Sequence, residues 1–300
     1  MRAATTAPLF ALAASFCICQ QTVPSDEPAF LDPNQSAPAG TRYKTFHSQT
    51  IKGDVSYLIY LPPGYDTSTG RRYPVIYWLH GKGGNQRGGG VFVAQLDSAI
   101  KSGASPAVIA VLVNGLRDSR YYDSYDGKRP VETVFVKDLI PHVDATYRTL
   151  SKREFRALEG FSMGGFGAAH LGFKYPELFG AVSIMSGALL DDESVVTQAD
   201  LYEKNFGGNR DYFHQGSPWV LVRENAKKIR GRTFVRIGVG DRDNLFERDT
   251  NYHKLLDSLN IRHDFFTVPE VAHEQGKFYE KLGGGAFEFY RRAFRAAPSK

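Results

Sequence analysis

The chain has 300 residues, of which 42% are hydrophobic, 23% charged and 13% aromatic, and its formal net charge is +5. This length and composition are those of a globular protein with a sizeable core, which excludes collagen-like and disordered classes. The two cysteines of the chain, Cys17 and Cys19, both lie near its start. Disulfide scaffolds, iron–sulfur centres, zinc ribbons and thiol nucleophiles are therefore excluded from the rest of the chain. The mild positive charge does not indicate nucleic-acid binding.

The first 19 residues are typical of a signal peptide. Arg2 supplies a positive start, residues 9–19 form an apolar run, and Cys17 and Cys19 are small residues of the kind that signal peptidases accept. The run is shorter than the about 20 residues that a membrane span needs. We therefore expect a secreted or periplasmic protein cleaved near Cys19, with a lipid anchor on Cys17 or Cys19 as the alternative.

The next segment, residues 20–40, is rich in proline, serine, alanine and aspartate. Such a composition buries too little apolar surface to offset the entropy lost on ordering, so we expect a disordered linker. The folded part is then expected to be one domain over residues 41–300, with an insertion at about residues 190–232.

Apolar and amphipathic segments alternate along this domain. Buried strands are predicted at residues 55–61, 74–79, 108–113, 181–185 and 233–239, and an alternating strand at residues 262–268. Helices are predicted at residues 91–100, 133–147, 164–175 and 248–259. This alternation predicts an α/β fold with a mostly parallel central sheet and helices on both faces. In such sheets the functional residues follow the ends of strands.

The most informative strand end carries the pattern Gly160-x-Ser162-x-Gly164, with a short predicted strand before it and a helix after it. This is the pattern of a nucleophile elbow, the sharp turn that exposes the serine of α/β-hydrolases. The serine of such a turn takes an unfavourable backbone conformation, and the two glycines leave room for the close strand and helix. We therefore predict Ser162 as a catalytic nucleophile.

A serine hydroxyl needs a general base, and the base needs an acid to orient it. With this elbow the partners follow the serine in the order acid, then histidine. His273 lies in the loop after the last predicted strand, where it can reach back over the sheet, and is predicted as the base. Three other histidines that follow the serine lie within predicted helices or at the start of a strand: His170, His253 and His263.

The acid is expected after the preceding strand, where Asp241 and Asp243 are both candidates and the spacing does not separate them. The oxyanion needs two donors, and one is expected to be the N–H of Met163. The second is expected to be the N–H of Lys82, in the glycine-rich loop of residues 81–90. A phosphate loop is excluded there, because a glycine and not a serine or threonine follows Lys82.

No cofactor and no metal ion is expected. The sequence contains no HExxH motif and no closely spaced set of histidine, aspartate and glutamate beyond the residues already assigned. The expected partner is a small-molecule or carbohydrate ester, because the polar and aromatic residues 117–126 suit a sugar or phenolic ester. Tyr121, Tyr122, Tyr125 and, in the insertion, Trp219 are candidates to line its pocket.

Several motifs taken together resemble one family. They are LPPGY at residues 61–65, YPVIYWLHG at 73–81, DLIPHVD at 138–144, GFSMGG at 160–165 and YPELF at 175–179. Over about residues 43–295 the chain resembles the secreted "putative esterase" family, which includes feruloyl and acetylxylan esterases, esterase D, S-formylglutathione hydrolase and mycolyltransferases. The resemblance implies an α/β-hydrolase that acts as a serine esterase.

The resemblance also bears on the acid and on the histidine loop. The family acid stands at the last position of G-x-x-D, which here is Asp243 and not Asp241. The glycine pair that usually precedes the histidine is replaced by Val271 and Ala272, so the rim beside His273 differs from the family pattern.

Other functions remain as alternatives. An acyltransferase would use the same residues with an alcohol as acceptor. A peptidase of the same fold matches the oxyanion loop less well. A non-catalytic carbohydrate-binding or adhesion module would not need Ser162, Asp243 and His273 together.

Overall fold

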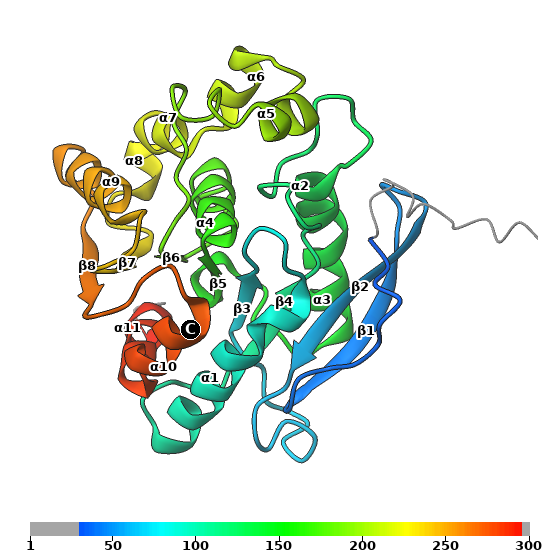
Figure 1. The fold of residues 1–300 in the computed structure, drawn as a ribbon. Helices are drawn as coiled ribbons and strands as arrows, with labels where there is room; N and C mark the ends of the chain where they lie inside the picture. Colours follow the sequence, from blue (N-terminus) through cyan, green and yellow to red (C-terminus); the bar gives the residue numbers. More distant parts are fainter. Residues whose placement is uncertain (1–29, 296–300) are drawn as a thin grey trace, which may run out of the picture.

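The computed structural model describes residues 30–295, so the predicted signal peptide and residues 20–29 of the predicted linker lie outside the described part. Within it, eight strands form one sheet in the order β1-β2-β4-β3-β5-β6-β7-β8 (Figure 1). The strands are β1 Thr41–Ser48, β2 Gly53–Tyr60, β3 Val75–Leu79, β4 Ile109–Val113, β5 Arg156–Phe161, β6 Ala181–Met185, β7 Phe234–Gly240 and β8 His263–Val268. β1 pairs antiparallel with β2 and β2 antiparallel with β4, and the remaining neighbours are parallel.

The predicted mostly parallel sheet is confirmed, and the predicted strand ends differ from the observed ones by at most two residues. The central strands were recognisable because both of their faces are buried, which requires a continuous apolar run. β1 was missed. It is an edge strand with charged and polar side chains, and only Phe46 and Ser48 are buried, so its sequence carries no apolar run.

Helices cover both faces of the sheet. They are α1 Gly90–Ser102, α2 Val131–Thr133, α3 Ile140–Thr146, α4 Met163–Lys174, α5 Ala199–Phe206, α6 Arg210–Gly216, α7 Pro218–Glu224, α8 Ala226–Ile229, α9 Phe246–Ser258, α10 Gln275–Leu282 and α11 Glu288–Arg295. Short 3₁₀ turns occur at Gln86–Gly89, Arg153–Phe155 and Gly284–Phe287. No helix of residues 30–295 combines the length and apolarity that crossing a membrane requires.

Neighbouring side chains of one strand show how the two layers form, because successive side chains point to opposite faces of a sheet. In β3, Trp78 stacks on Phe92 of α1, in a core cluster that also contains side chains of α10 and α11. The preceding Tyr77 packs edge-on against Phe135, in a second cluster that includes residues of α3, α4 and α9. The sheet is thus enclosed between two helical layers, as predicted.

The predicted helix at residues 133–147 is present but not uniform. It consists of α2, a π-helical stretch at Val134–Leu139, and α3. Pro141 lies in the first turn of α3 and has no N–H to donate to the carbonyl of Lys137. The wider π turn occurs where this missing bond interrupts the α-helical pattern.

The N-terminal boundary of the domain differs from the prediction. Residues 30–34 belong to the predicted linker, yet Phe30 is buried and its carbonyl accepts hydrogen bonds from Ser56 N–H and the Asn114 side chain, both at 2.9 Å. Asp32 pairs with Arg87. One aromatic side chain in a polar segment is too weak a pattern to predict, but here it is buried with its backbone satisfied.

The predicted insertion between β6 and β7 contains α5 to α8. In Figure 1, α5, α6 and α7 lie together beyond one end of α4. Apolar side chains of α5 and α6, together with Leu190 and Val195 before them, form a third cluster with two residues from elsewhere in the chain, Tyr122 and Phe166. Because Phe166 lies in the first turn of α4, the insertion packs directly beside the start of this helix.

Candidate active site

The predicted sharp turn is present between β5 and α4, with Ser162 at its centre. Ser162 has φ 60° and ψ −117°, a conformation that is costly for a residue with a side chain and that tends to occur at functional sites. A Cβ at Gly160 would lie 2.1 Å from the carbonyl oxygen of Gly164, and one at Gly164 would lie 1.9 Å from that of Leu79. The close approach of strand and helix therefore requires both glycines.

The structure brings Ser162, His273 and Asp243 together. His273 Nδ1 lies 2.8 Å from Asp243 Oδ2 and 3.1 Å from Oδ1, and His273 Nε2 lies 2.8 Å from Ser162 Oγ. A carboxylate can only accept a hydrogen bond, so the proton of the neutral imidazole is on Nδ1. Nε2 then accepts a hydrogen bond from the Ser162 hydroxyl, so a basic nitrogen is in direct contact with the serine.

Asp243 reaches the histidine through a tight turn after β7, in which its N–H donates to the Gly240 carbonyl. Burial would raise the pKa of Asp243, but hydrogen bonds from His273 and from the N–H of Leu245 outweigh it and hold that pKa below its ordinary value. Asp241, the other sequence candidate, is exposed. The carboxylate that contacts His273 is thus Asp243, the one indicated by the family resemblance.

The glycine-rich loop after β3 lies beside the serine. An added Cβ at Gly81 would be 3.5 Å from Ser162 Cβ and 4.0 Å from its Oγ. The Gly81 carbonyl accepts hydrogen bonds from His80 Nδ1 at 2.9 Å and from Gly84 N–H at 3.1 Å. The N–H of a trans peptide points away from its carbonyl, so the N–H of Lys82 points to the opposite side of this peptide.

Both predicted oxyanion donors are unengaged. In residues 30–295 neither the N–H of Lys82 nor that of Met163 donates to another protein group. Met163 is the first residue of α4, and first-turn N–H groups have no partner within their own helix. Two backbone donors are therefore free beside the elbow.

His80 is a residue that the sequence analysis did not assign. Its ring is buried, its Nε2 accepts from Gly115 N–H at 3.2 Å, and its Nδ1–H donates to the Gly81 carbonyl. Burial lowers the pKa of His80 to about 4, so the ring is neutral near pH 7. His80 thereby fixes the orientation of the Gly81–Lys82 peptide. The sequence feature that could have indicated this role is the position of His80 between the strand and the glycine-rich loop.

Asp249 carried no sequence signal, and Arg120 was expected only as one of the polar and aromatic residues 117–126. Asp249 of α9 is fully buried, accepts from Gly187 N–H at 2.8 Å, and has its pKa raised by burial. Arg120 is also buried, and its Nε and Nη1 have no partner within residues 30–295. Burial and the charge of Arg248 lower the pKa of Arg120 to about 10. Both are polar groups that long-range packing places around the elbow loops.

The aromatic residues predicted for the pocket are mostly engaged in packing. Tyr121 is fully buried and donates to the His80 carbonyl, and Tyr122 is buried in the insertion cluster. Trp219 donates from Nε1 to the Leu189 carbonyl at 3.0 Å. Of this group only Tyr125 is well exposed, and the other three are joined by hydrogen bonds to carbonyl groups of neighbouring segments.

The sheet order and the turn carrying Ser162 define the class of protein, an α/β-hydrolase. A family model described as "Putative esterase" matches residues 48–297, so the chain belongs to this esterase family.

Curated relatives match part of the chain. Esterase Rv1288 of Mycobacterium tuberculosis is 34% identical over 161 residues, which cover 52% of this chain and 34% of that protein. An endo-1,4-beta-xylanase/feruloyl esterase of Xylanibacter ruminicola is 31% identical over 160 residues, which cover 50% of this chain and 22% of that protein. The matched part thus spans about a third or less of these relatives.

Among solved structures, a ferulic acid esterase superposes with a TM-score of 0.74 at 22% identity, covering 86% of this chain and 100% of that one. At this identity the likeness concerns the fold.

Proposed function

We propose that this protein is a serine esterase that hydrolyses carboxylic esters through an acyl-enzyme. The observation that carries the proposal is the pair of hydrogen bonds of His273, one to Ser162 Oγ and one to Asp243. Membership of the esterase family supports the same reaction class.

In the proposed reaction, Ser162 Oγ attacks the ester carbonyl while His273 Nε2 takes the hydroxyl proton. Asp243 orients the ring and stabilises the imidazolium that forms. The N–H groups of Met163 and Lys82 donate to the oxyanion, an interaction in which each donor is worth about 10²–10³ in turnover. The tetrahedral intermediate collapses, and His273 returns the proton to the leaving alcohol. Water then repeats the sequence on the acyl-serine, releasing the carboxylic acid and the free serine.

For the substrate we propose acetyl or feruloyl esters of carbohydrates. The names of two similar proteins, a xylanase/feruloyl esterase and a ferulic acid esterase, support this class. Export through residues 1–19, which lie outside the described part, would bring the enzyme to such polymers. Mass spectrometry of the mature N-terminus after expression in the native host would test the export.

The first experiment compares wild type with Ser162→Ala on p-nitrophenyl acetate. We expect the variant to lose at least about 10³ of kcat with an unchanged melting temperature. Ser102→Ala, which changes an exposed serine at the end of α1, is the control and should keep kcat. Full activity of Ser162→Ala would refute the serine mechanism.

A second experiment identifies the substrate. Methyl ferulate, feruloylated and acetylated xylo-oligosaccharides and a glutathione thioester are compared by kcat/KM, and products are analysed with a sugar present as acceptor. Preference for the carbohydrate esters with release of free acid is the expected result. Transfer of the acyl group to the sugar would instead identify a transferase.

A further inference from the structure

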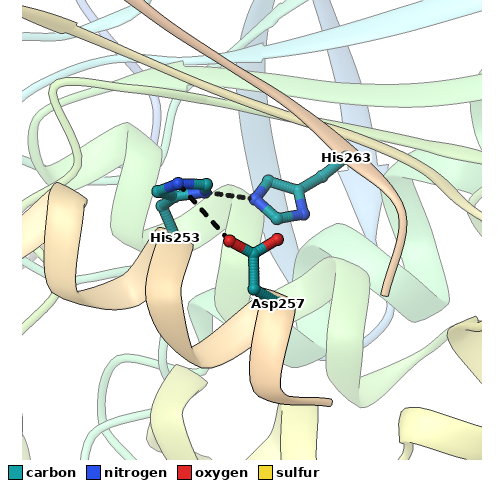
Figure 2. A group of neighbouring side chains, drawn as sticks. All are labelled: His253, Asp257 and His263. Atoms are coloured by element: carbon teal, nitrogen blue, oxygen red, sulfur yellow. Dashed lines mark hydrogen bonds and ion pairs between the residues drawn. The ribbon is translucent and has the colours of Figure 1, made fainter. Parts of the chain in front are cut away.

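Three ligand-type side chains converge at a place remote from Ser162 in the sequence. His253 and Asp257 lie one turn apart on α9, and His263 opens β8 (Figure 2). One ligand atom from each of the three lies within 4.8 Å of the others. We propose that His253, Asp257 and His263 bind a divalent transition-metal ion of the zinc type.

When both rings are neutral, the hydrogen bonds of His263 indicate which nitrogen of each ring carries the proton. His263 Nδ1 lies 2.7 Å from the carbonyl oxygen of Ile261, which can only accept, so Nδ1 carries the proton and Nε2 has a lone pair. His253 Nδ1 lies 2.7 Å from that Nε2 and must therefore be the donor. In its neutral form His253 then directs the lone pair of its Nε2 toward Asp257, whose carboxylate Oδ2 is 3.5 Å away.

The Nε2 of a neutral His253 and the Asp257 carboxylate direct lone pairs at each other across 3.5 Å, a contact that either a proton on Nε2 or a bound cation makes favourable. Two ligands on a tetrahedral zinc ion, each bound at about 2.0–2.1 Å, are about 3.4 Å apart. The observed separation of His253 Nε2 and Asp257 Oδ2 matches this spacing. When the metal binds, His263 Nε2 no longer accepts the hydrogen bond from His253 Nδ1 and instead becomes the third ligand of the ion.

The surroundings hold the rings as a metal site requires. The Ile261 carbonyl orients His263 in the way that metal-ligating histidines are commonly oriented by a second partner. The ring of His253 stacks on Phe265 with 4.3 Å between centroids and 4° between planes. The Asp257 side chain is 62% exposed, so the ion is reached from solvent and a water molecule completes its coordination.

The donor set indicates which ion binds. Two imidazole nitrogens and one carboxylate suit zinc and its neighbours, whereas calcium and magnesium prefer oxygen ligands. The sequence did not predict a metal site here. The spacing His-x₃-Asp-x₅-His brings the three ligands together only because the chain turns from the end of α9 into β8.

The ion would act as a structural clamp between α9 and β8. Asp243 lies before α9 and His273 lies after β8, so both elements continue into the loops of the site described above. His263 begins β8, whereas His273 follows its other end, which separates the metal ligands from Ser162 by the length of the strand.

The test uses the full-length mature protein purified without a histidine tag and stripped with EDTA. Zinc is added in isothermal titration calorimetry and in thermal melts, and cobalt(II) is added to record the visible absorption of its coordination sphere. Wild type should bind one ion per chain and melt at a higher temperature with zinc. Asp257→Asn and His263→Gln should each weaken binding at least about tenfold and lose the zinc-dependent shift.

His47→Gln is the matched control, because His47 and Asp54 form an exposed pair, 3.1 Å apart, that has no third ligand among residues 30–295. This variant should bind zinc as wild type does. Asp257→Asn changes an exposed side chain and therefore keeps the test valid if His263→Gln does not fold.

Three results would overturn the proposal. They are no binding to wild type at millimolar zinc, equal affinity in Asp257→Asn and wild type, or loss of binding in His273→Ala instead. The last result would place the ion at the Ser162 site.

Discussion

The orientation of the Gly81–Lys82 peptide can be tested through His80. Replacement by asparagine places an amide nitrogen near the position of Nδ1 and keeps the donor to the Gly81 carbonyl. Replacement by glutamine places its amide near Nε2, which keeps an acceptor for Gly115 N–H and removes the donor to Gly81. The two variants thus separate the hydrogen bond that orients the proposed oxyanion donor, the N–H of Lys82, from the hydrogen bond that does not.

The expected loss of kcat follows from the hydrogen bonds that the Gly81 carbonyl accepts. It keeps the bond from Gly84 N–H in both variants, so His80→Gln loses one of two constraints, worth about 1 kcal/mol or about fivefold in the population of the active orientation. Complete loss of the Lys82 donor sets the limit, at about 10²–10³ in kcat. His80→Gln should therefore lose between about fivefold and about 10² in kcat, and His80→Asn less than about threefold.

The assay is kcat on p-nitrophenyl acetate with melting temperatures measured in parallel. Both variants lose one hydrogen bond of a buried ring, so their melting temperatures should fall by similar amounts. Because the pKa of His80 is about 4, the ring of the wild type stays neutral above about pH 5, and the ratio of each variant's kcat to that of wild type should not change from pH 6 to pH 8. Equal kcat values for His80→Asn and His80→Gln would refute the reasoning.

Three further substitutions test the packing. Gly164→Ala puts a methyl group 1.9 Å from the Leu79 carbonyl and should abolish soluble folded protein, whereas Gly276→Ala meets no atom within 4 Å and should be tolerated. Phe30→Ala should cost about 3–5 kcal/mol in urea unfolding, and a change as small as that of the exposed Leu31→Ala would contradict the burial of Phe30. The raised pKa of Asp249 means that the folded protein keeps a proton which the unfolded chain loses above about pH 3.9. Its stabilising effect is therefore complete below that pH and decreases as pH rises. Asp249→Asn should gain stability over wild type progressively from pH 4 to pH 8, and a difference independent of pH would contradict the assignment.

Much of the fold could be predicted because central strands buried on both faces need continuous apolar runs, and each such run stands between helical segments. The edge strand β1 and the contacts of Phe30 could not be predicted from the sequence. An edge strand with one covered face needs few apolar residues, and a single aromatic residue gives no periodicity.

The serine turn was also predictable, since Gly160, Ser162 and Gly164 lie within five residues and the turn is local. The choice between Asp241 and Asp243 was not local. Spacing left both open, family resemblance indicated Asp243, and the hydrogen bond to His273 now distinguishes the two.

Features formed by residues that are close in the sequence, such as a turn, a strand or a helix, could therefore be predicted from the sequence alone. Long-range proximity required the folded chain. His80 fixes a peptide through its ring, Asp249 supports a loop from another strand, and His253, Asp257 and His263 meet only across the junction of α9 and β8. The reason is physical, because a pattern in the sequence records which face of an element is buried, whereas the tertiary packing decides which side chains of different elements meet.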